Sequence, residues 1–89
     1  MSKSVYKLDV GKLKKDTEPT SAISFMAYEI ENANNHNLSK MAIKEQLDRS
    51  AERGMFPSNL EYVDSYTDSL TGVTTSAFLN KDTGKVTLG

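Results

Sequence analysis

The sequence predicts an α+β fold in which a helical hairpin packs on a small antiparallel β-sheet. Between residues 20 and 53, apolar residues recur with the spacing of helix faces. From residue 60 onward, apolar and polar residues alternate as they do in β-strands. The chain has 89 residues and no cysteine, so we expect one small domain that is held together by its core alone.

Residues 1–17 are predicted to form a basic N-terminal arm, and residues 18–89 a single small domain. The first 15 residues hold five lysines and one aspartate. Gly11 interrupts a helix, and Val5, Leu8 and Val10 fit neither the helix nor the strand period. We therefore expect a solvated arm or a short strand, and the alternative is an arm that folds back on the more acidic remainder of the chain.

The first helix is predicted over residues 20–34. Pro19 suits the start of a helix, and Thr17 and Thr20 offer oxygens that can cap the free N–H groups of the first turn. The side chains of one face recur at helical spacing: Ile23, Met26, Ala27, Ile30 and Ala33. The asparagines around His36 suit the left-handed conformation that ends a helix.

A second helix is predicted over residues 39–53. Ser39 can cap its start, and Ile43 and Leu47 form a narrow buried stripe. Arg53 followed by Gly54 is typical of a helix end. Only a short loop separates the two helices, which predicts a helical hairpin.

Three strands are predicted between residues 60 and 88. The first runs from about residue 60 to 67, and a hairpin joins residues 73–80 to residues 85–88. The intervening turns, residues 68–72 and 81–84, each contain a glycine. Because the last strand runs to the end of the given sequence, we expect this chain to be a piece of a longer protein. The alternative is a short terminal strand.

The residues predict no catalytic, cofactor or metal site. The single histidine, His36, lies in an asparagine-rich turn, and there is neither a second histidine nor a cysteine to complete a metal site. Asp64 and Asp68 lack the regular ligand spacing of a calcium loop. The chain also lacks a Gly-x-Ser-x-Gly nucleophile elbow and the glycine-rich loops that bind phosphate.

Composition argues against two classes of partner. The formal net charge is −1, which gives no electrostatic reason to expect nucleic acid. No apolar run approaches the roughly 20 residues that span a bilayer. The N-terminus lacks the apolar stretch of a cleavable signal peptide, so we expect a cytoplasmic protein or one exported without such a signal.

The candidate partner surface lies on the first predicted strand and the turn after it. Residues 57–80 contain three acidic residues and no lysine or arginine. We expect an acidic face there, with two tyrosines on one face of the strand. The members of this surface are Glu61, Asp64, Asp68, Tyr62 and Tyr66.

The C-terminal third resembles a known family. The segment Tyr66-Thr67-Asp68, then Thr71-Gly72-Val73, and then residues 76–89 (SAFLNKDTGKVTLG) is similar to the opening β-hairpin of class 3 lipase-like α/β-hydrolases. In that family one or two helices precede the hairpin, as predicted here. The resemblance implies that the nucleophilic serine, the aspartate and the histidine lie outside this chain, so no catalytic residue is assigned to it.

Two hypotheses about function follow. In the first, the chain is a non-catalytic N-terminal portion of a lipase-like α/β-hydrolase, and the missing C-terminal portion completes its sheet. In the second, it is a stand-alone α+β module that binds a partner protein through a sheet edge or the acidic face. Either reading allows a homo-oligomer, because a free strand edge can pair with a second copy.

Overall fold

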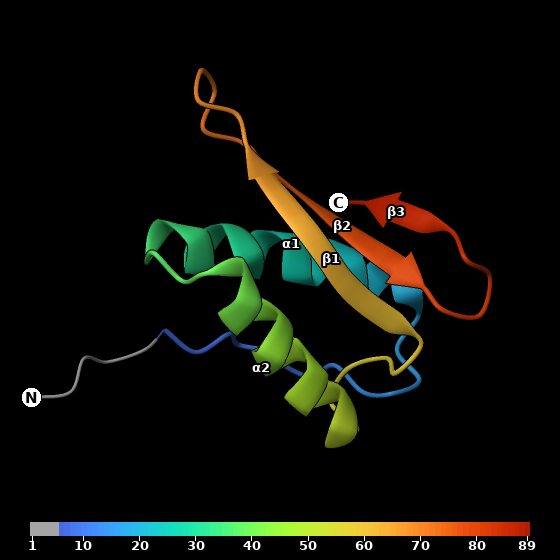
Figure 1. Cartoon of the computed structure of the whole chain (residues 1–89). Helices are drawn as coiled ribbons and strands as arrows, with labels where there is room; N and C mark the ends of the chain where they lie inside the picture. Colours follow the sequence, from blue (N-terminus) through green and yellow to red (C-terminus); the bar gives the residue numbers. More distant parts are fainter. Residues whose placement is uncertain (1–5) are drawn as a thin grey trace, which may run out of the picture.

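The computed structural model describes residues 6–89, which form two helices followed by a three-stranded sheet (Figure 1). The helices are α1 (Pro19–Asn35) and α2 (Lys40–Glu52). The strands are β1 (Leu60–Thr67), β2 (Thr74–Asn80) and β3 (Val86–Leu88). The α+β fold class predicted from the sequence is confirmed.

The helices begin and end near their predicted bounds, with one change at the first cap. Pro19 opens α1, but the capping side chain is that of Glu18, which accepts a hydrogen bond from the Ser21 N–H at 2.9 Å. The expectation that Thr17 caps the helix is wrong, because its hydroxyl instead accepts from the Lys14 N–H at 2.8 Å. Ser39 caps α2 as predicted, with its hydroxyl 3.1 Å from the Ala42 nitrogen.

The predicted hairpin between the last two strands is confirmed. All pairs are antiparallel, in the order β1-β2-β3, and Leu79 lies opposite Val86. Gly84 takes the positive φ of 73° that the turn needs. In the turn between β1 and β2, Gly72 has a φ of 74°.

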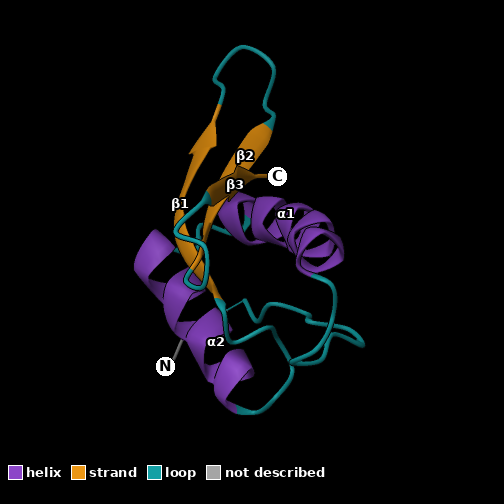
Figure 2. Cartoon of the chain, turned by 90° about the vertical axis from the view of Figure 1, so that its right-hand side faces the viewer, coloured by secondary structure: helices purple, strands orange, loops and turns teal. Residues whose placement is uncertain are grey.

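Each helix packs against a different strand. α2 lies next to β1, on the side away from β2, and α1 lies against β2 (Figure 1). Figure 2 shows the two helices as separate bodies that both border the sheet. The core between them centres on Phe78, whose ring lies 5.9 Å from that of Tyr62 and 6.2 Å from that of Phe56.

The N-terminal arm is not a solvated tail over the residues that the structure describes. Val10 is buried, and Tyr6, Leu8 and Leu13 pack against the core. Only the charged side chains between them, such as Lys7, project into water. The expectation fails because alternate side chains of the arm, read from Tyr6, are apolar and find a surface between the two helices. Neither helix of residues 6–89 is long and apolar enough to cross a bilayer.

Candidate interaction surface

A β-bulge in β1 decides which tyrosine reaches the surface. Tyr62 lies opposite Phe78, but Asp64 lies opposite Ala77, so one extra residue, Val63, is inserted into β1. A bulge of one residue exchanges the faces to which the following side chains point. The buried side chains of β1 therefore change from the even positions before the bulge to Ser65 after it.

The two tyrosines of the predicted surface consequently lie on opposite faces of the sheet. Tyr62 is 1% exposed and donates or accepts a hydrogen bond with the Ser65 hydroxyl at 2.6 Å, whereas Tyr66 is 70% exposed. Burial raises the pKa of the Tyr62 hydroxyl. The prediction that they share one face is wrong, and Tyr62 belongs to the core. In the run from Leu60 to Thr67, the adjacent apolar residues Tyr62 and Val63 break the alternation, and this break is the sequence signal that could have indicated the bulge.

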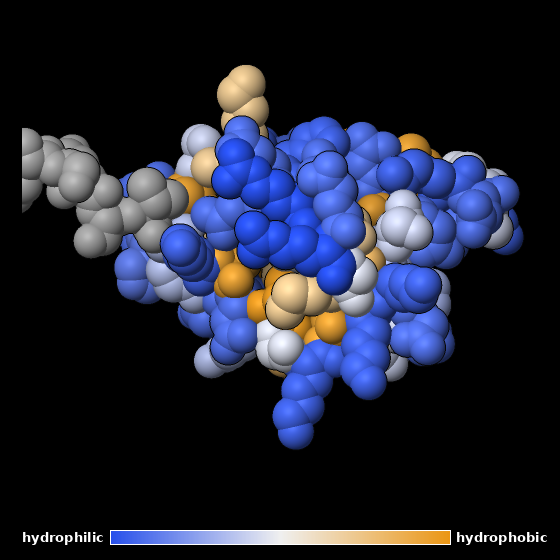
Figure 3. Space-filling model, turned by 90° about the horizontal axis from the view of Figure 1, so that it is seen from below, coloured by the Kyte–Doolittle hydropathy of each residue, from blue (hydrophilic) through white to orange (hydrophobic). Residues whose placement is uncertain are grey.

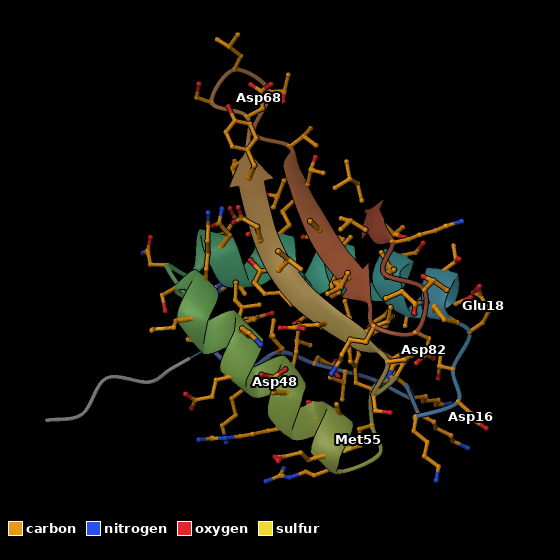
Figure 4. All side chains as sticks on the ribbon, turned by 45° about the vertical axis from the view of Figure 1, so that its right-hand side comes forward. Asp16, Glu18, Asp48, Met55, Asp68 and Asp82 are labelled. Atoms are coloured by element: carbon orange, nitrogen blue, oxygen red, sulfur yellow. The ribbon has the colours of Figure 1, made fainter. Side chains whose placement is uncertain are left out.

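Each of the three carboxylates of the predicted acidic face already forms an ion pair or hydrogen bonds within the chain. Lys40 lies 2.6 Å from Asp64, and Lys44 lies 3.2 Å from Glu61. The Lys40 ammonium lowers the pKa of Asp64, and Asp64 in turn raises the pKa of Lys40. Asp68 accepts hydrogen bonds from two N–H groups of its own turn and lies at the far tip of the β1–β2 hairpin (Figure 4). These residues therefore do not form one free acidic patch.

The outer edge of β3 carries unpaired backbone groups. Ser76 and Gly89 exchange two hydrogen bonds, of 2.8 and 2.9 Å, and the Asn80 N–H donates to the Lys85 oxygen at 2.8 Å. In an antiparallel pair, residues that exchange such bonds alternate with residues whose N–H and C=O point the other way. By this alternation, the N–H and C=O groups of Val86 and Leu88 face away from β2.

An apolar strip on the face of the sheet turned away from the helices continues to that edge. Phe78 points toward the helices, so its neighbours Ala77 and Leu79 point outward. Leu88 lies opposite Ala77 and Val86 lies opposite Leu79, and opposite residues share a face. Val86 and Leu88 are 58% and 67% exposed. We call Ala77, Leu79, Val86 and Leu88 the outer apolar strip.

The two edges of the sheet differ in their protection. The edge at β1 has the bulge at Val63, a neighbouring helix, and the ion pairs formed by Lys40 and Lys44. Bulges, edge charges and covering elements are the devices by which proteins prevent an edge from pairing with another chain. Val86, Thr87 and Leu88 carry no charge, and all three are exposed. The open edge is therefore the one at β3.

The carboxylates and the histidine of residues 6–89 lie at separate places (Figure 4). No group of three His, Asp or Glu side chains in this range is arranged to hold a metal ion. Asp16, Glu18, Asp48, Asp68 and Asp82 point outward at separate places (Figure 4). The Nδ1 atom of His36 lies 2.8 Å from the Asn32 carbonyl oxygen, and its ring stacks on that of Tyr6 with centroids 4.5 Å apart.

A groove of about 630 Å³ runs between the arm and α2. Lys7, Gln46, Arg49 and Arg53 line it, and Arg49 is held by Glu45 at 2.8 Å. Seen from below, this side of the molecule is mainly hydrophilic, with a narrow apolar band in its centre (Figure 3). The groove has neither a buried nucleophile nor a convergent set of metal ligands.

No family model, curated protein or solved structure matches the chain.

Proposed function

We propose that this chain is a non-catalytic docking module that completes its sheet by accepting an extended strand at the free edge of β3. One observation carries the proposal: the outward N–H and C=O groups of Val86 and Leu88, which lie beside exposed apolar side chains. Strand addition of this kind takes its affinity from main-chain hydrogen bonds and its specificity from alternate side chains. The outer apolar strip offers the surface for those side chains.

The structure favours the sheet edge over the acidic face as the docking surface. The Glu61 and Asp64 carboxylates already pair with lysines of α2, and Tyr62 is buried. A basic partner would compete there with lysines that are already in place. At the β3 edge, in contrast, an incoming strand displaces only water.

The resemblance to class 3 lipase-like α/β-hydrolases provides the first candidate for the source of the strand. In this reading the chain is the N-terminal portion of such an enzyme, and the next strand of the same polypeptide pairs with β3. The order of two helices before the β2–β3 hairpin supports it. Hydrolysis of acyl esters would then belong entirely to the portion that supplies the strand. The second candidate is a separate partner protein, and it is favoured by the outer apolar strip, which a partner's side chains can cover.

A proline substitution tests the edge directly. The Val86 N–H points away from β2, so Val86→Pro removes a donor from the free edge without removing a hydrogen bond of the β2–β3 pair. Val86→Thr is the matched control, because it keeps the N–H group and a β-branched side chain. Sedimentation velocity from micromolar to millimolar concentration is the measurement.

We expect the wild-type chain and the Val86→Thr variant to self-associate as concentration rises, and the Val86→Pro variant to remain monomeric. Circular dichroism establishes whether the proline variant folds, and Val86→Lys is the substitute if it does not. A wild-type chain that stays monomeric throughout, with one sharp unfolding transition independent of concentration, would overturn the proposal.

The coding sequence after Gly89 distinguishes the two sources of the strand. An in-frame continuation with a Gly-x-Ser-x-Gly elbow supports the hydrolase, and a stop codon supports the separate partner.

A further inference from the structure

We propose that the surface between α1 and α2 is a binding site for an extended peptide segment. Residues 6–10 of the chain occupy this site as a built-in ligand. The same segment of a second copy can take their place. The inference does not depend on the β3 edge. It follows from the way in which the helices hold the backbone of the arm.

The arm is bound as an isolated strand would be. Tyr6, Leu8 and Val10 point toward the core, while Lys7 and Asp9 between them are exposed. This alternation is that of a β-strand, yet the segment pairs with none of the strands of the described chain. Side chains of the helices take the place of a neighbouring strand.

The side chain of Gln46 on α2 forms hydrogen bonds with the main chain of the arm. Its side-chain amide donates to the Tyr6 carbonyl oxygen at 2.9 Å and accepts from the Leu8 N–H at 2.8 Å. A residue of a parallel neighbouring strand makes the same pair of bonds, to the C=O of one residue and the N–H of the residue two positions on. Both bonds go to main-chain groups, so this contact requires an extended conformation rather than particular side chains.

Glu29 of α1 makes the site selective for the side chain at the position of Tyr6. Glu29 as a residue is 8% exposed, and one oxygen of its carboxylate accepts from the Tyr6 hydroxyl at 2.5 Å and from the Asp9 N–H at 3.1 Å. A buried carboxylate requires such donors, because an unpaired charge is costly to remove from water. The ring of His36 stacks on the Tyr6 ring from the end of α1. The site therefore favours a phenol, followed by aliphatic residues two and four positions later.

The segment that joins the arm to α1 can open without loss of these contacts. Residues 14–18 form a mostly exposed turn, which is closed by two hydrogen bonds between Lys14 and Thr17. The Lys15 N–H also donates to the Gly54 carbonyl oxygen at 3.0 Å, so opening the turn costs three hydrogen bonds. Glu18 has a ψ of 129°, the extended conformation favoured before a proline. If the turn opens, the arm of a second copy can make every contact that the chain's own arm makes, which is the condition for exchange of an element between copies.

Cross-linking of mixed chains tests the exchange, because the protein has no cysteine of its own. Lys7 of the arm and Arg49 of α2 line the same groove, so a Lys7→Cys/Arg49→Cys double variant first establishes that a short bis-maleimide spans the two positions. A Lys7→Cys chain and an Arg49→Cys chain are then unfolded together, refolded at millimolar concentration and cross-linked. All chains carry Val86→Pro, so that pairing at the β3 edge does not contribute.

We expect a mixed cross-linked dimer, since tethered arms compete at an effective concentration in the millimolar range. A Lys81→Cys chain, which carries its thiol at the β2–β3 turn, replaces the Arg49→Cys chain as the control. A yield no higher than in this control would refute arm exchange at this site.

Discussion

Two serines on neighbouring strands should respond to substitution by alanine with opposite changes in the free energy of unfolding. Ser65 on β1 lies opposite Ser76 on β2, and both are buried. The Ser65 hydroxyl is hydrogen-bonded to Tyr62, whereas the Ser76 hydroxyl, which is fully buried, has no partner among the described residues. Replacing each serine with alanine therefore removes a satisfied hydroxyl in one case and an unsatisfied one in the other.

The magnitudes follow from the cost of burying polar groups. A buried hydroxyl without a partner costs about 1–3 kcal/mol, so Ser76→Ala should raise the free energy of unfolding by roughly 1 kcal/mol once small losses in packing are subtracted. Ser65→Ala leaves the Tyr62 hydroxyl buried and unpaired, and it should lower the free energy of unfolding by about 1–2 kcal/mol. For a domain of this size, 1 kcal/mol corresponds to a shift in Tm of about 4–8 °C.

Urea and thermal unfolding, followed by far-ultraviolet circular dichroism, measure both variants against the wild-type chain. A higher Tm for Ser76→Ala and a lower Tm for Ser65→Ala is the expected pattern. The reasoning is refuted if Ser76→Ala destabilises the protein, or if the two variants shift Tm in the same direction by similar amounts. The double variant adds a further check, because contacting residues need not contribute additively.

Two further predictions concern the arm. Gly11 has a φ of 58°, and a Cβ atom there would lie 2.8 Å from the Phe25 ring, so Gly11→Ala should lower stability by about 1–3 kcal/mol, whereas Lys12→Ala next to it should have little effect in the same unfolding assay. The hydrogen bond to Glu29 raises the pKa of Tyr6 from 10.0 to about 12. Between these values the unfolded chain loses the phenol proton and the folded chain keeps it, so this group's contribution to stability should be lost as the pH rises from about 10 to about 12. Ultraviolet difference titration should show one late phenol that Tyr6→Phe removes, and a profile unchanged by that substitution would contradict the assignment.

The elements that local chemistry determines could be predicted from the sequence. Ser39 and Gly54 bound α2 because a hydroxyl satisfies free N–H groups and glycine accepts a positive φ, and both effects act within a few residues. The β2–β3 hairpin has the same origin in the turn at Gly84. Asn37, in the loop between α1 and α2, has a φ of 62°, a conformation that asparagine readily adopts.

The features that depend on tertiary contacts could not be predicted. The adjacent Tyr62 and Val63 break the alternation of β1, but this pattern alone does not distinguish a bulge from the end of a strand, and the bulge places Tyr66 on the face opposite to the buried Tyr62. The docking of the arm depends on Gln46 and Glu29, which lie far from it in the sequence and look like ordinary polar helix residues. The pairing of Asp64 with Lys40 likewise joins residues from different elements.

The unprotected edge at Val86 and Leu88 also bears on how the protein can be produced. An exposed strand edge of this kind is a template for pairing between newly made copies of a chain. We therefore expect overproduction of the wild-type chain in a host cell to yield inclusion bodies more readily than overproduction of the Val86→Lys variant.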